Sequence, residues 1–245
     1  MVRTFEFAFA FLYSNLAIVA IVAIVNCPVL FKIPKLRVCH LRFYITWIFM
    51  GKNMMQAIEK FRALNQEIRK CKNCRLWKTR MHALPGEGKI SSRLVLVAQA
   101  PGYTEDSEGR MFIGPSGKKL NEIFARIGVD REEMFMTNIL RCVLPKGRRP
   151  RQDEIEACTQ YLDREIDLVN PKIISTLGYF AARYIFKKYD VRSELRFPKV
   201  CGKVSSRNDK TILPLRHPAA LLYDNSLHRK MVVNYSKLRK LLGSL

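Results

Sequence analysis

Short apolar runs alternate with amphipathic helical patterns over most of this chain, and this alternation restricts the fold more than any other feature. Each run is bounded by turn-forming residues and is too short to be a helix. The runs predict four strands, at Leu94–Val97, Met134–Ile139, Lys172–Leu177 and Thr211–Leu215. Helical periods are present at Met55–Lys70, Gly117–Ile127, Gln152–Val169, Gly178–Lys188 and Leu227–Leu242. The pattern predicts an α/β fold, a three-layer sandwich in which helices cover both faces of a four-stranded parallel sheet.

Polar and turn-forming residues follow each of these predicted strands. They are Gln99–Gly102 after the first strand, Thr137 and Asn138 at the end of the second, Gly178 after the third and Arg216–Ala220 after the fourth. Ligands of parallel α/β sheets bind beyond the carboxyl ends of the strands. The sequence therefore predicts a single site at that edge of the sheet.

The charge balance favours a polyanionic partner. The chain has 43 Lys and Arg residues against 21 Asp and Glu residues, a net charge of +22. A field of this strength attracts nucleic acid or an anionic membrane surface. The alternative is a basic protein from an organism whose composition favours Lys and Arg. We expect nucleic acid to be the partner.

The first 53 residues differ in composition from the rest of the chain. Residues 7–25 are apolar except for Ser14 and Asn15, and about 20 apolar residues can span a bilayer. The basic stretch that follows would leave the rest of the chain in the cytoplasm, and a cleaved signal peptide fits poorly. A mis-assigned start is the other reading, because Met50, Met54 and Met55 are alternative start positions.

We therefore divide the chain into a hydrophobic leader, 1–53, and one folded domain, 54–245. The domain is expected in the cytoplasm, associated with the nucleoid, and is membrane-anchored only if residues 7–25 are expressed.

Four of the seven cysteines have a spacing typical of metal ligands. Cys71 and Cys74 form a C-x-x-C motif where the first helix ends, Cys142 follows the second strand, and Cys158 lies in the next helix. Four thiolates can hold a zinc ion or a [4Fe–4S] cluster, and spacing alone leaves that choice open. An odd, widely spread set of cysteines indicates a reducing compartment rather than a disulfide scaffold. No such pairing exists for Cys27, Cys39 and Cys201.

Several motifs agree in order and spacing with one family. They are Cys71–Cys74 with Leu76, Pro85–Gly88, Ala98–Gly102, Glu105 with Asp106, Gly109–Gly114, Thr137 with Asn138, Cys142, Pro150, Glu156–Cys158 and His217–Ala220. From about Met55 to its end, the chain resembles the family 4 uracil-DNA glycosylases, the thermophile-type iron–sulfur enzymes.

The resemblance implies a uracil-DNA glycosylase-like fold and a monofunctional hydrolase of DNA repair. Such an enzyme cleaves the N-glycosidic bond of uracil, a deaminated cytosine, in DNA and leaves an abasic site. It implies a [4Fe–4S] cluster on Cys71, Cys74, Cys142 and Cys158, with a role in structure or DNA contact rather than in chemistry. Uracil-containing DNA is the expected partner, a monomer the expected state, and no further small-molecule cofactor is expected.

Three residues suit the chemistry of uracil excision, for which the nucleotide must leave the base stack. The ring of Phe112 can stack on the base. The amide of Asn138 can pair with uracil N3–H and O4, and it mismatches cytosine. His217 can donate a hydrogen bond to O2 as the base leaves. The structural alternatives are a core Phe, a turn-forming Asn and a structural His.

The remaining substrate-binding residues surround the expected base. Ala100, Pro101 and Gly102 would supply backbone close to it, because small residues allow a near approach. Glu105 resembles the family residue that crowds out the 5-methyl group of thymine. A solvated loop acid is the alternative reading of Glu105.

Gln99 departs from the family pattern, which usually has Glu at this position. Gln can orient a water molecule but cannot act as a base, and a related family has a catalytic Asp where this chain has Ala100. We place Gln99 with His217 and Asn138 in the catalytic set, and Asp106 is a candidate substitute for the missing carboxylate. This departure motivates an alternative function, a non-catalytic iron–sulfur protein that binds damaged DNA. A small zinc-site DNA-binding module is a third interpretation.

Three further segments bear on DNA contact. Residues 219–223 could insert into the gap left by the flipped nucleotide. The basic run Lys146, Arg148, Arg149 and Arg151 suits phosphate binding, although a solvated face is an equal alternative for each residue. Gly114–Lys118 resembles a P-loop but fails the pattern, because Phe112 replaces the required glycine and Lys119 the Ser or Thr.

Overall fold

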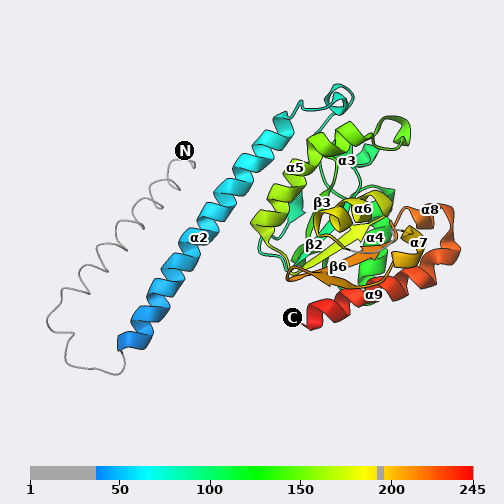
Figure 1. Ribbon diagram of the computed structural model, residues 1–245. Coiled ribbons are helices and arrows are strands. Elements are labelled where there is room, and N and C mark those ends of the chain that lie inside the picture. The colour runs from blue at the N-terminus through cyan, green and yellow to red at the C-terminus, as the bar shows by residue number, and fades with distance from the viewer. Residues whose placement is uncertain (1–36, 192–195, 245) are drawn as a thin grey trace. The chain divides into compact units, whose positions relative to one another are not determined.

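The computed structural model describes the backbone of residues 37–191 and 196–244, and side chains within these ranges from residue 54 onward (Figure 1). The chain divides into two compact units, Met1–Gln56 and Ala57–Leu245. The predicted leader run, 7–25, lies outside the described residues, and the division at residue 53 stays a prediction. Within the described ranges, no helix has both the length and the apolar character that crossing a bilayer requires.

A six-stranded sheet forms the centre of the second unit, with strand order β1-β3-β2-β4-β6-β5. Its strands are β1 (Glu87–Gly88), β2 (Leu94–Ala98), β3 (Phe135–Asn138), β4 (Ile173–Leu177), β5 (Ser205–Arg207) and β6 (Lys210–Leu215). The four predicted strands are confirmed as β2, β3, β4 and β6, which form the parallel centre of the sheet. Ala98 of β2 pairs with Asn138 of β3, and Leu177 of β4 pairs with Leu215 of β6. The two short antiparallel edge strands were not predicted, because they contain no apolar run.

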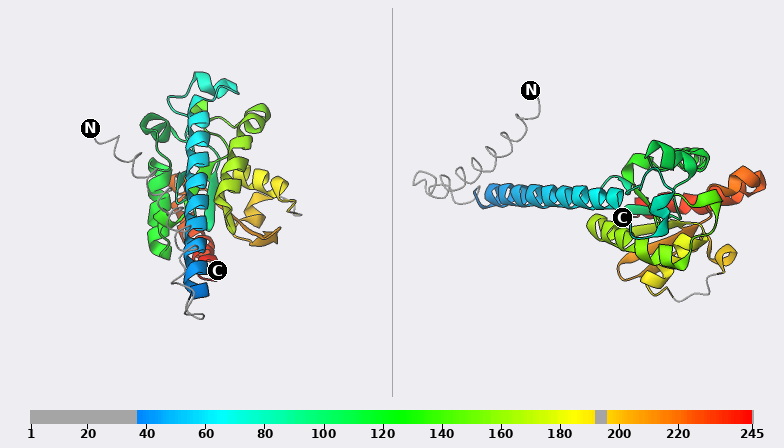
Figure 2. Two further views of the ribbon diagram at one scale, coloured as in Figure 1. Left: turned by 90° about the vertical axis from the view of Figure 1, so that its left-hand side faces the viewer. Right: turned by 90° about the horizontal axis from the view of Figure 1, so that it is seen from above.

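Helices cover both faces of this sheet, which confirms the three-layer prediction. Val95 and Val97 of β2 pack with α5 (Gln152–Val169), α6 (Tyr179–Lys188) and the end of α2 (Arg37–Lys70). The alternate residues Leu94 and Leu96 pack with α4 (Pro115–Ile127) and α9 (His228–Gly243) on the other face. Figure 2 shows α4 and α5 on opposite sides of the sheet. Because both faces are buried, the central strands are apolar throughout rather than alternating.

The remaining helical segments are short. They are η2 (Arg75–Lys78), α3 (Tyr103–Glu108), η3 (Arg131–Glu133), η4 (Pro145–Gly147), α7 (Phe197–Val200), α8 (Ala220–Tyr223) and η5 (Asn225–Leu227). The first predicted helix was too short, since α2 begins at Arg37 rather than Met55. Residues 37–70 contain no proline, so no proline separates the predicted helix from the helical residues that precede it.

A buried polar network ties the end of β3 to α5. The guanidinium of Arg141 lies 2.9 Å from Glu165 Oε2, and the two side chains are 1% and 0% exposed. Thr137 donates to the same oxygen at 2.6 Å, and the backbone N–H of Gly86 donates to Glu165 Oε1 at 2.8 Å. Buried charges persist when they are paired in this way. The network fixes the backbone on either side of Asn138.

Candidate functional site

A pocket of about 160 Å³ opens at the carboxyl edge of the parallel strands. It is lined by Ala100, Pro101, Gly102, Glu105, Phe112, Ser116, Asn138 and His217. Seven of the eight residues predicted to be catalytic or substrate-binding are in this lining. They come together because the loops after β2, β3 and β6 leave the sheet at one edge. The roles assigned to them stay predictions.

Asn138 ends β3 and brings an unpartnered acceptor to the pocket. The residue is 3% exposed, and its Nδ2 donates only a weak hydrogen bond, to Met111 Sδ at 3.5 Å. Its Oδ1 is buried and has no hydrogen-bond partner among the described residues. An unsatisfied buried acceptor costs about 1–3 kcal/mol. A ligand with an N–H at this position would recover that free energy.

Phe112 has an unusual backbone conformation, with φ at +53°. For a bulky residue the left-handed region is strained by about 1–3 kcal/mol. Arg131 stabilises the conformation by donating to Met111 O at 2.6 Å and to Phe112 O at 2.9 Å. Burial lowers the pKa of Arg131. Position 117 requires glycine, because a Cβ added to Gly117 would lie 1.9 Å from the backbone oxygen of Phe112.

His217 follows β6 and is neutral with a defined tautomer. The backbone N–H of Ala219 donates to His217 Nδ1 at 3.1 Å, so this nitrogen is an acceptor and the ring proton lies on Nε2. The side chain is only partly exposed, and the loss of surrounding water lowers the pKa of His217 to about 4. At neutral pH the ring therefore offers one donor, Nε2–H, and no charge.

Glu105 joins the two loops that frame the pocket. Its Oε2 accepts from the backbone N–H of Gly102 at 3.1 Å, and its Oε1 accepts from Gly114 at 2.7 Å. The side chain is 8% exposed, so it is not the solvated loop acid of the alternative reading. Its exclusion of a methyl group stays a prediction, which its place in the lining supports.

The structure does not support Asp106 as a substitute for the missing carboxylate. Its carboxylate accepts from the backbone N–H groups of Met81 at 2.9 Å and His82 at 3.1 Å, and it is not in the pocket lining. Gln99, also absent from that lining, has its backbone carbonyl bonded to the N–H of Leu140 at 3.0 Å. Glu105 is the sole carboxylate among the residues that line the pocket in the described part of the chain.

Ser116 is the lining residue that sequence reasoning missed. It lies in the first turn of α4, immediately after Pro115. The available signal was Pro115, because proline is frequent at the first position of a helix. A helix starting there places Ser116 and the free N–H groups of the first turn at the edge of the site.

The four predicted metal-ligand cysteines lie in one region of the core. Cys142 and Cys158 are buried in the cluster that contains α5, and Cys71 and Cys74 pack against it. Arg80 donates to Cys142 Sγ at 3.1 Å. Burial raises the pKa of the Cys74, Cys142 and Cys158 thiols, that of Cys158 to about 12.

The donor chemistry of this region fits a thiolate-bound centre. Cys142 interacts electrostatically with Cys71 and Cys74, and Cys158 with Cys74 and Cys142. The backbone N–H of Arg141 points at Cys158 Sγ at 3.2 Å, and such donors stabilise thiolates that bind a cluster. In the part of the chain that the structure describes, no group of three or more Cys, His, Asp or Glu side chains is arranged to hold a metal ion.

Residues 219–223, which were predicted to insert into the gap left by the flipped nucleotide, follow closely after His217 in the pocket lining. Within this segment, Leu221 is buried, whereas Leu222 is 45% and Tyr223 90% exposed. Leu222 and Tyr223 are thus the large exposed side chains of this segment, and its insertion into DNA stays a prediction.

Residues 85–238 match the model of the Uracil DNA glycosylase superfamily. A type-4 uracil-DNA glycosylase of Sulfurisphaera tokodaii is 41% identical over 192 residues, which cover 76% of this chain and 86% of that protein. One of Saccharolobus solfataricus is 39% identical, covering 73% and 84% respectively. One of Archaeoglobus fulgidus is 36% identical, covering 73% and 91%.

Proposed function

The chain belongs to the uracil-DNA glycosylase superfamily, and from this premise we propose that it is a DNA-repair hydrolase that removes uracil from DNA. It cleaves the bond between uracil N1 and the sugar C1′ and leaves an abasic site. The extent of identity to type-4 enzymes favours this activity over non-catalytic damage binding.

The unpartnered Oδ1 of Asn138 is the single observation that carries this assignment. Uracil presents an N–H donor at N3, which satisfies the buried oxygen. Cytosine presents a lone pair at N3, so two acceptors would face each other and the penalty would remain. The pocket therefore distinguishes the deaminated base from the normal one.

Phe112 and Glu105 determine how the base enters. A flipped nucleotide loses a few kcal/mol of stacking, and stacking on the Phe112 ring recovers part of it. Because Arg131 and Gly117 hold the Phe112 backbone in place, the ring needs no rearrangement on binding. Glu105 accepts hydrogen bonds from Gly102 and Gly114 and so fixes the two loops that frame the pocket.

His217 stabilises the leaving group. As the glycosidic bond breaks, its electron pair moves onto the uracil ring and negative charge collects on O2. The Nε2–H of neutral His217 donates to that oxygen without first losing a proton. Water adds to C1′ and releases one proton to solvent, and the departed uracil anion takes up one proton from solvent. The products are free uracil and an abasic sugar.

The lining carries no free carboxylate to activate this water within the described residues. Gln99 can orient a water molecule but cannot remove its proton. The reaction therefore depends on stabilising the departing uracil anion more than on a strong nucleophile. The sugar cation formed in such a dissociative reaction reacts with unactivated water.

We also propose that Cys71, Cys74, Cys142 and Cys158 hold a [4Fe–4S] cluster. Bound there, the cluster would cross-link three segments of the chain and take no part in breaking the glycosidic bond. The net charge of +22 supports association with DNA, and hence with the nucleoid.

Activity is tested with the full-length protein and a duplex oligonucleotide that contains one uracil. Treatment with alkali should break the strand at uracil and leave matched thymine and cytosine duplexes intact. Binding to the uracil duplex without release of uracil would instead support the non-catalytic alternative.

The metal centre is tested separately, by iron and sulfide analysis and the visible spectrum of anaerobically purified protein. Cys158→Ser should lose iron, whereas Cys201→Ser, a change outside the proposed ligand set, should retain it. Zinc in place of iron would contradict the cluster.

A further inference from the structure

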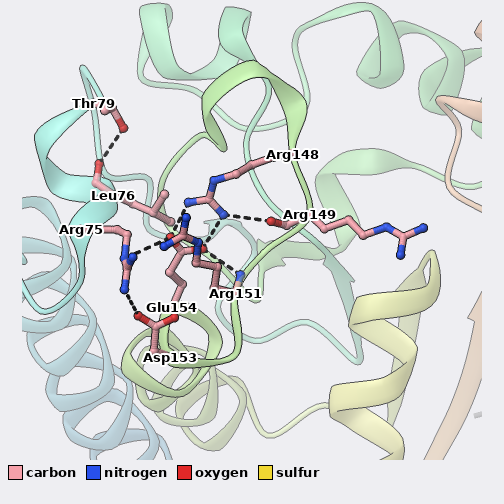
Figure 3. Close-up of polar contacts among 8 residues, drawn as sticks. All are labelled: Arg75, Leu76, Thr79, Arg148, Arg149, Arg151, Asp153 and Glu154. Carbon is pink, nitrogen blue, oxygen red and sulfur yellow. Dashed lines mark hydrogen bonds and ion pairs between the residues drawn. The ribbon is translucent and has the colours of Figure 1, made fainter.

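The basic residues at 146–151 differ in their partners, because Arg148 is paired with a buried carboxylate, that of Glu154. Arg148 donates to Glu154 Oε2 through one guanidinium nitrogen at 2.9 Å and to Oε1 through the other (Figure 3). The backbone N–H of Arg151 donates to the same Oε2 at 2.9 Å. The Glu154 side chain is 0% exposed, and the hydrogen bond from Arg148 lowers its pKa.

A second arginine joins this ion pair from a distant segment. Arg75, just after the C-x-x-C motif, donates to Asp153 at 2.6 Å and lies 3.9 Å from Glu154 Oε1. Arg75, Arg148, Asp153 and Glu154 together form what we term the Glu154 cluster. Two guanidinium and two carboxylate charges balance within it, so Arg148 retains little charge to offer a ligand.

Arg149 and Lys146 differ from Arg148 in side-chain exposure and in ion pairing. The side chain of Arg149 extends away from the Glu154 cluster (Figure 3), while its backbone carbonyl accepts from Arg148 at 2.9 Å. Both side chains are exposed, and neither makes an ion pair within the part of the chain that is described. Lys146 (φ +53°) and Gly147 (φ +63°) both have left-handed backbone conformations, so the chain turns sharply at this point.

The loop that contains Lys146 and Arg149 starts at the edge of the sheet where the pocket opens, which gives the two charges a use. The loop follows β3, whose last residue is Asn138, so it leaves the sheet at the edge where the pocket opens. DNA whose uracil occupies the pocket carries phosphates on both sides of the flipped nucleotide. Arg and Lys neutralise such phosphates without reading sequence.

We propose that Lys146 and Arg149 bind backbone phosphates of the DNA next to the flipped nucleotide, on a loop that Arg148 fixes through Glu154. This inference rests on the proposed function, because the orientation of DNA follows from the pocket. It assigns three of the four basic residues in the run, two as phosphate contacts and one as the residue that fixes the loop.

The salt dependence of DNA binding by the full-length protein tests this assignment. Affinity for a uracil-free duplex would be measured between about 50 and 200 mM salt for Lys146→Gln, Arg149→Gln and the double variant. Each lost phosphate contact should reduce the slope of log K against log salt by about 0.9. Arg149→Lys should retain the slope.

Arg207→Gln is the matched control. It removes the same charge from an exposed residue at the end of β5, at the opposite edge of the sheet from the pocket. Its slope should equal that of the wild type. Arg148→Met should lower the melting temperature, which Arg149→Gln should not change.

An unchanged slope in both Lys146→Gln and Arg149→Gln would overturn the proposal, as would an equal change in Arg207→Gln. Failure of the proposed function is distinguishable, since it would appear as absent uracil release by the wild type. The slopes on uracil-free DNA can be measured whatever that outcome.

Discussion

The pocket and the Glu154 cluster each contain a buried polar side chain, and the two side chains differ in whether they have partners. In the pocket, Asn138 Oδ1 has no partner among the described residues and Phe112 has a strained backbone. In the Glu154 cluster, the buried carboxylate accepts from Arg148 and from the backbone of Arg151. The pocket thus retains an unpaired acceptor and a strained backbone that cost folding free energy, whereas the cluster contributes to folding and is complete without a ligand.

Asn138→Leu should separate activity from stability most strongly. It removes the acceptor that we propose pairs with uracil, so kcat/KM for the uracil duplex should fall by about 10³–10⁴-fold. Because an unsatisfied buried oxygen disappears with it, the free energy of unfolding should stay constant or rise. A coupled measurement of uracil release and thermal unfolding checks both. A marked loss of stability would show that Asn138 is satisfied in the free protein.

His217→Asn should reduce kcat by about 10²–10³-fold, because the shorter Asn side chain ends before the position of Nε2 and so withdraws the donor from the oxyanion. It also has a signature in stability. Since the folded pKa is about 4 and the ordinary value 6.5, the unfolded chain binds more protons between these values, and unfolding becomes easier as pH falls from 6.5 to 4.

His217→Asn should remove this contribution, up to about 3 kcal/mol, while leaving stability at pH 7.5 nearly unchanged. Wild-type activity should not fall with a midpoint near pH 6.5. Such a midpoint would mean that the ring is not neutral in the way its hydrogen bond from Ala219 indicates.

Glu154→Gln should give the reverse pattern to Asn138→Leu. Loss of the carboxylate leaves Arg148 without its partner and should lower the free energy of unfolding by about 2 kcal/mol. The rate constant kcat at saturating substrate and low temperature should change less than threefold, because the pocket is untouched. Glu156→Gln, an exposed neighbour on the same helix, is the control and should alter neither quantity.

Arg131→Gln should have the smallest effect of these four substitutions. It tests whether the hydrogen bonds from Arg131 maintain the strained backbone of Phe112. Without the two hydrogen bonds to Met111 and Phe112, the ring should adopt more orientations. We expect KM to rise by about 10-fold with a smaller change in kcat. Asn121→Ala, which removes a weaker partner of Arg131 at 3.1 Å, should have little effect on KM.

The central strands and most of the pocket could be predicted because their signals are local and their geometry is shared. A buried parallel strand requires a continuous apolar run, and the carboxyl ends of such strands necessarily converge. Ala100, Asn138 and His217 were therefore expected together. The edge strands β1 and β5 gave no signal, since two or three polar residues pair there only because a neighbour offers an edge.

The functions of individual charged residues could not be predicted, because they depend on partners brought together by folding. Arg148 and Arg149 are neighbours of the same type, and only the position of Glu154 distinguishes them. Asp106 faces backbone N–H groups of residues 81 and 82 instead of the pocket. The left-handed backbone of Phe112 is also absent from any local pattern, because Arg131 and Gly117 impose it.

The modest edges of the sheet have a consequence for behaviour at high local concentration. β1 contains two residues and β5 contains three, and those of β5 are polar and largely exposed. Edges this short present few free N–H and C=O groups on which a strand of another molecule could add. Many copies gathered along one DNA molecule are thus poor templates for β-aggregation, and their like charges oppose close approach once they leave it.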